Sequence, residues 1–574
     1  MADIEACGMV FVLNDNGQGF ALDLKCTDKD GIKRLSVGMD FHGKKQPKKV
    51  SLSWSIPAIR PDGVWSCCGG MNRRLTPDWE PYTVSARSAS EYPVLSVLSF
   101  DDVNICTVSS MDAETPINLK AGYKEEKSEL VFSVEWFVNV TEKADGYKTE
   151  LLIDTRPIYF AKCVSTAEKE LSERYGLQAA PKSAFMPVFS TWYCFHQELN
   201  REKLLAECIK AKELGLETVI IDDGWQSDDN NRGYGFSGDY IPAIKKVGNI
   251  KSLTEEIKKI GLKSMLWFSL AFSGDFTAGA EKFRNMTLYR EDGLNASVVD
   301  PRFAEIRKHI VAYCVKAVGE WGFDGLKLDF IDSFKLTEEN AVKDGIDCSS
   351  LEEGIRRLTD ELSCALKAEK NDVLIEFRQR YIGPAMQRLG NMLRVGDCPG
   401  ALLQNRISII DLRLISGARA VHCDPLEWNV GESPEYIAKA FINTIFSVLQ
   451  FSVYPSDLTK DQRKVVERYI RFMKKYEDVL LHGELTPKGA LNNYISCSAE
   501  NNGVEIIALY SQAVIKITKS KTIVLNASES DKIVVDCDDE RVYSVENCFG
   551  QLVSSGKTSG LKYITVPVGG MLIL

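Results

Sequence analysis

The chain contains 574 residues, which is too many for one ordinary hydrophobic core, so about two to four domains are expected. Hydrophobic residues make up 44% of it and charged residues 26%, a composition typical of water-soluble globular proteins. The formal net charge of −10 disfavours a nucleic-acid partner or an anionic membrane surface. No apolar stretch is long enough to cross a bilayer.

The N-terminal residues lack the basic segment and long apolar segment that mark a secretory signal. The sixteen cysteines show no repeated spacing and no C-x-x-C pair, and two of them, Cys67 and Cys68, are adjacent. We therefore expect reduced core thiols and a cytoplasmic protein.

Residues 1–170 are predicted to form an N-terminal β-sandwich domain. They contain short β-branched and aromatic runs bounded by Gly, Asp, Asn and Pro, such as "SELVFSVEWFVNV" and "YKTELLIDTRP". Residues 486–574 return to this texture with "GVEIIALY", "KTIVLNA" and "DKIVVDC", which predicts a small C-terminal all-β domain, again a sandwich.

Residues 180–485 alternate between strand and helix patterns. Amphipathic stretches such as "AEIRKHIVAYCVKAVGEWG" separate most of the apolar runs. The eight strand candidates, in chain order, are "AFMPVFSTWY", "TVIIDDGW", "LKSMLWFSL", "FDGLKLDF", "DVLIEF", "NMLRV", "ARAVHC" and "LQFSVYPSD". This number and length favour a (β/α)₈ TIM barrel over an open doubly wound sheet, and no G-x-G-x-x-G follows a strand. The predicted fold class is therefore multidomain α/β, with a central barrel between two β domains.

Polar residues at the C-terminal ends of barrel strands are the default active-site candidates. In chain order they are Trp192, Asp222, Asp223, Trp225, Trp267, Lys327, Asp329, Arg378, Arg380, Asp397, His422 and Asp424. Each of the three tryptophans could equally be a packing residue.

Lys327 and Asp329 lie two residues apart in a strand, so their side chains should share one face and point into the barrel mouth. A neighbouring lysine lowers the pKa of a carboxyl group and keeps it ionised. An ionised, desolvated carboxylate is what a glycosidase nucleophile requires. The alternative is an ion pair that only seals the barrel.

Three segments resemble the α-galactosidase clan, glycoside hydrolase families 27 and 36, with family 36 the nearer. "FDGLKLDF" is similar to the clan's K-x-D nucleophile strand, and "VIIDDGWQ" to its D-D/x-G-W strand. "FSVYPSDLTKDQRKVVERYIRFMKK" resembles the end of a family 36 barrel. The motifs cover roughly residues 185 to 490.

The resemblance implies a role for individual residues. Asp329 matches the nucleophile, and Lys327 matches the lysine that binds substrate beside it. Asp222 and Asp223 match the aspartates that hold the C4 and C6 hydroxyls of galactose. Asp397, in "MLRVGDCPG", is the corresponding general acid/base.

The chain departs from the family pattern in two places. "IEFRQRYIG" replaces a C-S-G-G-G-G-R segment that shapes the pocket near C2 of the sugar, with Arg380 the best match to its arginine. Arg378, Arg380 and the intervening glutamine could accommodate a more polar or anionic sugar. "GARAVHCD" replaces a G-A-H-x-S-A strand, which makes His422 and Asp424 candidate subsite residues.

The resemblance implies a retaining α-galactosidase, a hydrolase of carbohydrate metabolism that releases terminal α-galactose from an oligosaccharide or glycoside. Its two carboxyl groups should lie about 5–5.5 Å apart. An α-N-acetylgalactosaminidase and a raffinose-synthase-like transferase stay open, as does an inactive carbohydrate-binding protein. Five histidines without metal-binding spacing argue against a metal site, and we expect no cofactor. Family 36 members are often oligomers, so a homo-oligomer also stays open.

Overall fold

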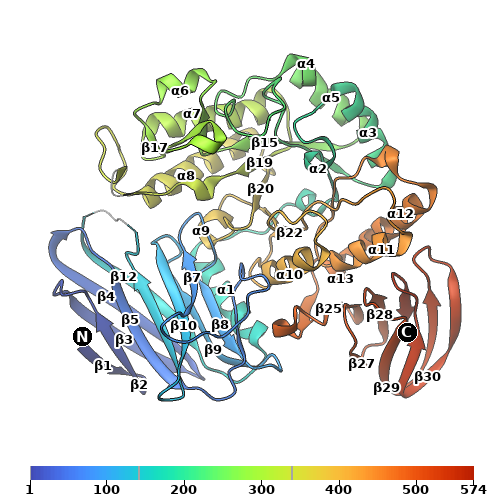
Figure 1. Cartoon of the computed structure of the whole chain (residues 1–574), viewed down its shortest axis with the longest axis horizontal. Helices are drawn as coiled ribbons and strands as arrows, with labels where there is room; N and C mark the ends of the chain where they lie inside the picture. Colours follow the sequence, from blue (N-terminus) through green and yellow to red (C-terminus); the bar gives the residue numbers. More distant parts are fainter. Residues whose placement is uncertain (1, 140–142, 338–339) are drawn as a thin grey trace.

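A computed structural model describes residues 2–139, 143–337 and 340–574. Figure 1 shows the N-terminal strands at the lower left, the central α/β region above them and the C-terminal strands at the lower right. No helix in these described ranges is long and apolar enough to span a bilayer.

Two six-stranded sheets form the N-terminal region. The first has the order β1 (Ala2–Ala6), β2 (Met9–Asn14), β5 (Val50–Pro57), β11 (Glu129–Trp136), β10 (Ile117–Lys124) and β7 (Tyr82–Ala86). The second has the order β3 (Ala21–Lys29), β4 (Ile32–Lys45), β12 (Ala144–Asp154), β9 (Asn104–Ser110), β8 (Val94–Leu98) and β6 (Gly63–Trp65). Side chains from both sheets, among them Phe11, Trp54, Leu35 and Val97, form one buried core, which is the packing of a β-sandwich.

Eight parallel strands form the central barrel in strict chain order. They are β13 (Val188–Ser190), β14 (Thr218–Ile221), β15 (Lys263–Ser269), β19 (Gly325–Asp329), β20 (Leu374–Arg378), β21 (Met392–Arg394), β22 (Ala420–His422) and β23 (Gln450–Phe451). β23 pairs with β13, and a parallel bridge between His422 and Val448 joins the other edge to the chain just before β23. All eight strands coincide with predicted strand candidates, so the predicted barrel is confirmed.

Helices cover the barrel between successive strands and after the last one. The longer ones are α3 (Arg201–Leu214), α5 (Ile250–Ile260), α7 (Ala304–Val315), α8 (Leu351–Glu369), α10 (Leu402–Arg413), α11 (Pro434–Asn443) and α12 (Lys460–Lys475). The shorter ones are α2 (Trp192–Phe195), α4 (Ile244–Val247), α6 (Ala278–Lys282), α9 (Pro384–Gln387) and α13 (Glu477–Leu480). α1 (Phe160–Arg174) precedes the barrel. After β15, the strands β16 (Phe272–Gly274), β17 (Thr287–Glu291) and β18 (Ala296–Val299) form a separate three-stranded sheet.

Local sequence signals explain where helices begin and end. The Asn200 side chain accepts the backbone N–H of Lys203 at the start of α3, and Gly215 ends that helix at φ 100°, a conformation that favours glycine. At the start of α12, Thr459 and Gln462 form a capping box.

A layer of apolar side chains closes the N-terminal end of the barrel. It includes Val188, Ile220, Met265, Leu374 and Met392, each from a different strand. Such a layer makes the barrel a packed core rather than a channel, so ligands can enter only from the opposite end.

The C-terminal strands form one mixed eight-stranded sheet. They are β24 (Glu484–Lys488), β25 (Ser496–Asn501), β26 (Val504–Leu509), β27 (Val514–Ile517), β28 (Lys521–Asn526), β29 (Lys532–Glu546), β30 (Leu552–Thr565) and β31 (Met571–Ile573). Side chains from β26 to β31 share one core, so the sheet folds over itself. The predicted domain boundaries stay a prediction, because the limits of a sheet do not define an independently folding unit.

The three regions meet at Asp411 of α10, which is fully buried. Its carboxylate accepts hydrogen bonds from Arg73, at 2.7 and 2.8 Å, and from the Trp65 indole at 2.8 Å, both in the N-terminal region. The Tyr494 hydroxyl, in the C-terminal region, donates to the same carboxylate. A buried charge is tolerated when it is paired and hydrogen-bonded in this way.

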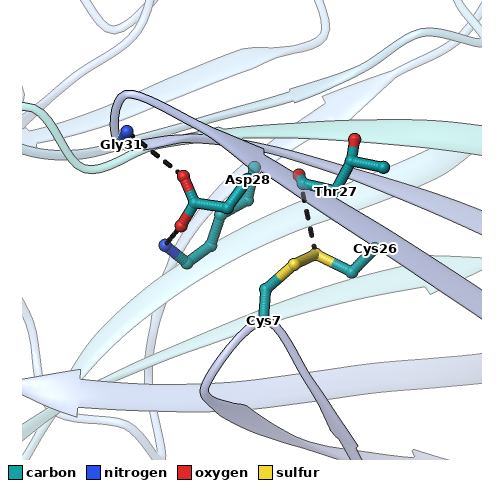
Figure 2. The surroundings of a disulfide bond; sticks show 6 residues. Cys7, Cys26, Thr27, Asp28 and Gly31 are labelled. Carbon is teal, nitrogen blue, oxygen red and sulfur yellow. Dashed lines mark hydrogen bonds and ion pairs between the residues drawn. A yellow bond between two sulfur atoms is a disulfide. The ribbon is translucent and has the colours of Figure 1, made fainter.

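One disulfide departs from the sequence prediction. Cys7, in the turn between β1 and β2, is bonded to Cys26 of β3 (Figure 2). The prediction of reduced thiols is therefore wrong for this pair, and a disulfide is uncommon in cytosolic proteins. The other cysteines are free, and most of them are buried.

Candidate active site

Lys327 and Asp329 are both on β19 and are both buried, each with 6% of its surface exposed. Lys327 Nζ donates to Asp222 Oδ2 at 2.6 Å, so the direct partner of the lysine is the aspartate at the end of β14 rather than Asp329. The register sets Trp267 beside Lys327 and Ser269 beside Asp329 on neighbouring strands. The sequence pattern therefore leads to a cluster of charges inside the barrel mouth.

Asp329 accepts hydrogen bonds at both carboxylate oxygens. Arg378 Nε donates to Oδ1 at 2.9 Å, the Tyr381 hydroxyl donates to the same oxygen, and Trp267 Nε1 donates to Oδ2 at 3.2 Å. Burial alone would raise the pKa of Asp329, but the charges of Arg378 and Lys327 and these hydrogen bonds hold it well below its ordinary value. Asp329 is thus an ionised carboxylate in a largely dry site.

The two aspartates after β14 have different partners. Asp222 is bonded to Lys327 and also accepts the backbone N–H of Asp223 at 3.0 Å. Asp223 accepts the side-chain amides of Gln197 and Gln226, each at 2.6 Å. Burial raises the pKa of Asp223 to about 6, although these hydrogen bonds act in the opposite direction. Both carboxylates lie 2% exposed at the same strand end, where they could bind sugar hydroxyls.

Arg394 at the end of β21 connects three carboxylates. It is 2% exposed and donates to Asp424 Oδ1 at 2.5 Å and to Asp397 Oδ1 at 2.7 Å. Its Nε lies 3.6 Å from Glu376 Oε1 on β20. Burial raises the pKa of Asp424 to about 6 even though Arg394 lowers it. This arginine therefore hydrogen-bonds the carboxylates that follow β21 and β22 and forms an ion pair with the one inside β20.

Asp397 faces an open cavity of about 330 Å³, and 49% of its side chain is exposed. Arg378 and Asp332 line the same cavity. Burial tends to raise the pKa of Asp397, but Arg394, Arg378 and Lys327 together lower it. The pKa of Asp332 is raised by burial, which Arg378 offsets only in part.

The remaining predicted residues are spread over different environments. Trp192 is partly exposed, with its ring 4.6 Å from that of His196. Trp225 is fully buried between strands and helices, and its indole donates to the Trp267 carbonyl at 2.9 Å, which makes it a packing residue. Arg380 has 64% of its side chain exposed and pairs with Glu91 of the N-terminal region at 3.2 Å.

His422 does not reach the open cavity. It is fully buried, and its Nε2 lies 2.8 Å from the Ala184 carbonyl at the closed end of the barrel. Burial lowers its pKa to about 3, so the imidazole is neutral. Its neighbour Asp424, by contrast, joins the acidic cluster around Arg394.

Sequence analysis missed five residues of this site: Tyr193, Asp332, Glu376, Tyr381 and Arg394. Tyr193 donates to Asp424 Oδ2 at 2.8 Å, and Tyr381 contacts Asp329. Glu376 stands two residues before Arg378 in "LIEFR", and Arg394 is the one charged residue in "NMLRV". The two-residue period that identified Lys327 and Asp329 could have found both of these charges.

The described part of the chain contains no group of three or more His, Cys, Asp or Glu side chains placed to hold a metal ion. The carboxylates of the site are instead neutralised by Lys327, Arg378 and Arg394.

No family model matches the chain. Two curated relatives match short segments: the α-galactosidase AgaA of Geobacillus stearothermophilus is 26% identical over 132 residues, and Mel36A of Lactobacillus acidophilus is 35% identical over 91 residues. These matches cover 22% and 15% of this chain and only 18% and 12% of the relatives' own lengths.

Solved structures match over nearly the whole chain. AgaA superposes with a TM-score of 0.64 at 14% identity over 98% of this chain and 82% of its own. The α-galactosidase of Lactobacillus brevis gives a TM-score of 0.63 at 13% identity, over 98% and 81%. Substituted variants of AgaA have been solved in complex with stachyose, with raffinose and with 1-deoxygalactonojirimycin. From sandwich through barrel to C-terminal sheet, this chain has the fold of the α-galactosidases of glycoside hydrolase family 36, the family that its sequence motifs resemble.

Proposed function

We propose that the protein is a retaining α-galactosidase-like glycoside hydrolase that releases a terminal α-linked galactose-type sugar from oligosaccharides. The observation that carries this proposal is the environment of Asp329, a buried carboxylate kept ionised by Arg378 and Lys327 at the open end of the barrel. A pure carbohydrate-binding protein has no need of such a group. The short matches to curated α-galactosidases and the sugar complexes of AgaA support the same class of substrate.

In this mechanism Asp329 attacks C1 of the sugar, and a covalent glycosyl-enzyme forms as the glycosidic bond breaks. Asp397 gives a proton to the departing oxygen and later removes one from the water that releases the sugar. Asp222, Asp223 and Lys327 bind the hydroxyl groups of the sugar.

Asp397 must be protonated in the first step, yet Arg394 holds its pKa below the ordinary value. The proposal therefore requires substrate binding to weaken the contact between Arg394 and Asp397. Asp332 is the competing general acid, because it lines the same cavity and its pKa is raised by burial.

The arginines of "EFRQRYIG" do not favour an anionic sugar. Arg378 is bonded to Asp329, and Arg380 is paired with Glu91 outside the barrel mouth. Tyr381 also points at Asp329, so this segment contacts the proposed nucleophile directly. A neutral galactose-type sugar is the substrate that these contacts favour, with hydrolysis and transfer both compatible with them.

The test is hydrolysis of nitrophenyl α-galactoside and raffinose by the wild type and by Asp329→Ala, Asp397→Ala and Asp332→Ala. Loss of the general acid should lower the rate of raffinose hydrolysis by about 10²–10⁴-fold. The rate with nitrophenyl α-galactoside should fall less, because nitrophenolate is a good leaving group that needs little protonation. Azide should restore activity to the acid/base variant and yield α-galactosyl azide. If azide restores activity to Asp332→Ala but not to Asp397→Ala, Asp332 is the general acid/base. If β-galactose is the first product, the enzyme inverts the configuration and the retaining mechanism is contradicted.

A parallel assay on nitrophenyl α-N-acetylgalactosaminide distinguishes the sugar at C2. If only that substrate is cleaved, the proposed mechanism stands, but the terminal sugar is N-acetylgalactosamine instead of galactose. Binding of galactose without cleavage of either glycoside would leave a carbohydrate-binding protein.

A further inference from the structure

The cavity beside Asp397 continues onto the N-terminal sandwich. Besides barrel residues, this 330 Å³ cavity is lined by Cys68 and Gly70. A second cavity, of about 680 Å³, shares Cys68 and Arg380 with it and extends along residues 66–84. Cys68 and Arg380 line both cavities, so the two cavities are adjacent, and we name them together the sandwich groove.

The sandwich groove has the chemistry of a carbohydrate site. Its lining includes the polar side chains of Asn72, Arg74, Glu80 and Tyr82. Trp79, whose side chain is 67% exposed, lies in the turn between the lining residues Pro77 and Glu80. An exposed indole offers a flat apolar surface with a hydrogen-bonding edge, and convergent polar groups can bind the hydroxyls of a sugar that packs on it.

The segment that carries this groove is held in place by contacts at both ends. Arg73 forms the buried ion pair with Asp411 of the barrel helix α10, at 2.7 Å. The Ser66 and Tyr82 hydroxyls lie 2.8 Å apart, and the Asp78 N–H donates to the Tyr123 carbonyl at 3.0 Å. A surface that is ordered before the ligand arrives loses less entropy on binding.

We propose that the sandwich groove binds the part of an oligosaccharide that lies beyond the cleaved bond, with Trp79 as a stacking surface. This inference rests on the proposed function, because the cavity reaches the groove from Asp397, where the leaving oxygen would be. A sugar chain that leaves the barrel mouth past Asp397 and Arg380 would run onto the residues between Asn72 and Tyr82. The N-terminal sandwich thereby selects for oligosaccharides over simple galactosides.

The test is binding of galactose, raffinose and stachyose to Asp329→Ala protein by calorimetry, because this variant cannot consume the ligand. We expect affinity to rise with chain length. Trp79→Ala, added to Asp329→Ala, should weaken stachyose binding by about five- to ten-fold, as truncation of one important contact residue does. The loss for stachyose should exceed the loss for galactose. Phe100→Ala is the matched control, since Phe100 is a similarly exposed aromatic residue of the sandwich whose chain neighbours, unlike those of Trp79, do not line the groove.

Equal affinities for the three sugars, or equal losses in Trp79→Ala and Phe100→Ala, would overturn the sandwich groove while leaving the proposed function intact if galactose binds. Stachyose binding that depends on Trp79 without any galactose binding would support the groove and contradict the proposed terminal sugar. Absence of binding by all three sugars would overturn both proposals.

Discussion

Replacing Arg378 by glutamine removes a positive charge from the immediate surroundings of Asp329. Arg378 Nε lies 2.9 Å from Asp329 Oδ1 in a buried site. Burial pulls the pKa of Asp329 upward, and Arg378 is the largest of the groups that pull it down. An arginine at this distance lowers a carboxyl pKa by about 1–3 units, so the pKa of Asp329 should rise by about 1–3 units in Arg378→Gln.

The sign of the effect on activity follows from the role of the carboxylate. Asp329 attacks only when ionised, so kcat/KM falls as the pH drops through its pKa in the free enzyme. In the wild type that pKa lies well below the ordinary value of about 3.9, and the decline is confined to strongly acidic solutions. The acidic limb of the profile should move toward neutral pH in the variant by the same number of units.

Stability provides a second readout with its own sign. Because the folded-state pKa of Asp329 is depressed, its contribution is present above the unfolded pKa and is lost as the pH falls toward the folded value. Each unit of pKa difference corresponds to about 1.4 kcal/mol of unfolding free energy, so Arg378→Gln should lose about 1.4–4 kcal/mol at neutral pH.

The assay is kcat/KM for nitrophenyl α-galactoside as a function of pH, together with denaturant unfolding at neutral pH. Arg380→Gln is the control, because Arg380 is two residues away and has 64% of its side chain in solvent. Its acidic limb should coincide with that of the wild type. An unshifted limb in Arg378→Gln, or an equal shift in both variants, would refute the role assigned to Arg378.

Two further predictions concern stability. Lys327→Met leaves the buried Asp222 carboxylate without its 2.6 Å partner and should lower the unfolding free energy by about 3–5 kcal/mol, measured by denaturant unfolding. Lys25→Met removes only an exposed ion pair and should leave the unfolding free energy nearly unchanged. An equal loss of unfolding free energy in the two variants would contradict the stabilising role of the buried Lys327. Burial lowers the pKa of His422 to about 3, so its contribution to stability is present above about pH 6.5 and is lost as the pH falls toward 3. His422→Gln should therefore show a shallower loss of stability between pH 7 and 5, and an unchanged slope would argue against a neutral His422.

The barrel was predictable because its strands are buried on both sides. Continuous apolar runs such as "TVIIDDGW" and "FDGLKLDF" are easily distinguished from the amphipathic helices between them, and each run contains a strand in the structure. The C-terminal region was harder to define. Its strands are recognisable one by one, but their pairing into one folded sheet depends on contacts between distant residues, such as Val545 with Leu572.

The site was predictable where strand periodicity sets the direction of a side chain. Lys327 and Asp329 share the barrel interior as their spacing requires. Periodicity does not identify the partner of a side chain, because the partners come from different strands. Lys327 pairs with Asp222, and Arg394 pairs with both Asp397 and Asp424. The burial of Trp225 among helices and of His422 near the closed barrel end likewise follows from packing that no short motif records.

The ion pair of Asp411 has a consequence for how this protein can be divided. Its carboxylate is satisfied by Trp65 and Arg73 from one flank of the barrel and by Tyr494 from the other. A shortened chain that kept only the barrel would lose these hydrogen bonds and would expose the apolar surface that both flanks now cover. We therefore expect that the barrel does not fold without its two flanking regions and that all three regions unfold together in one cooperative transition.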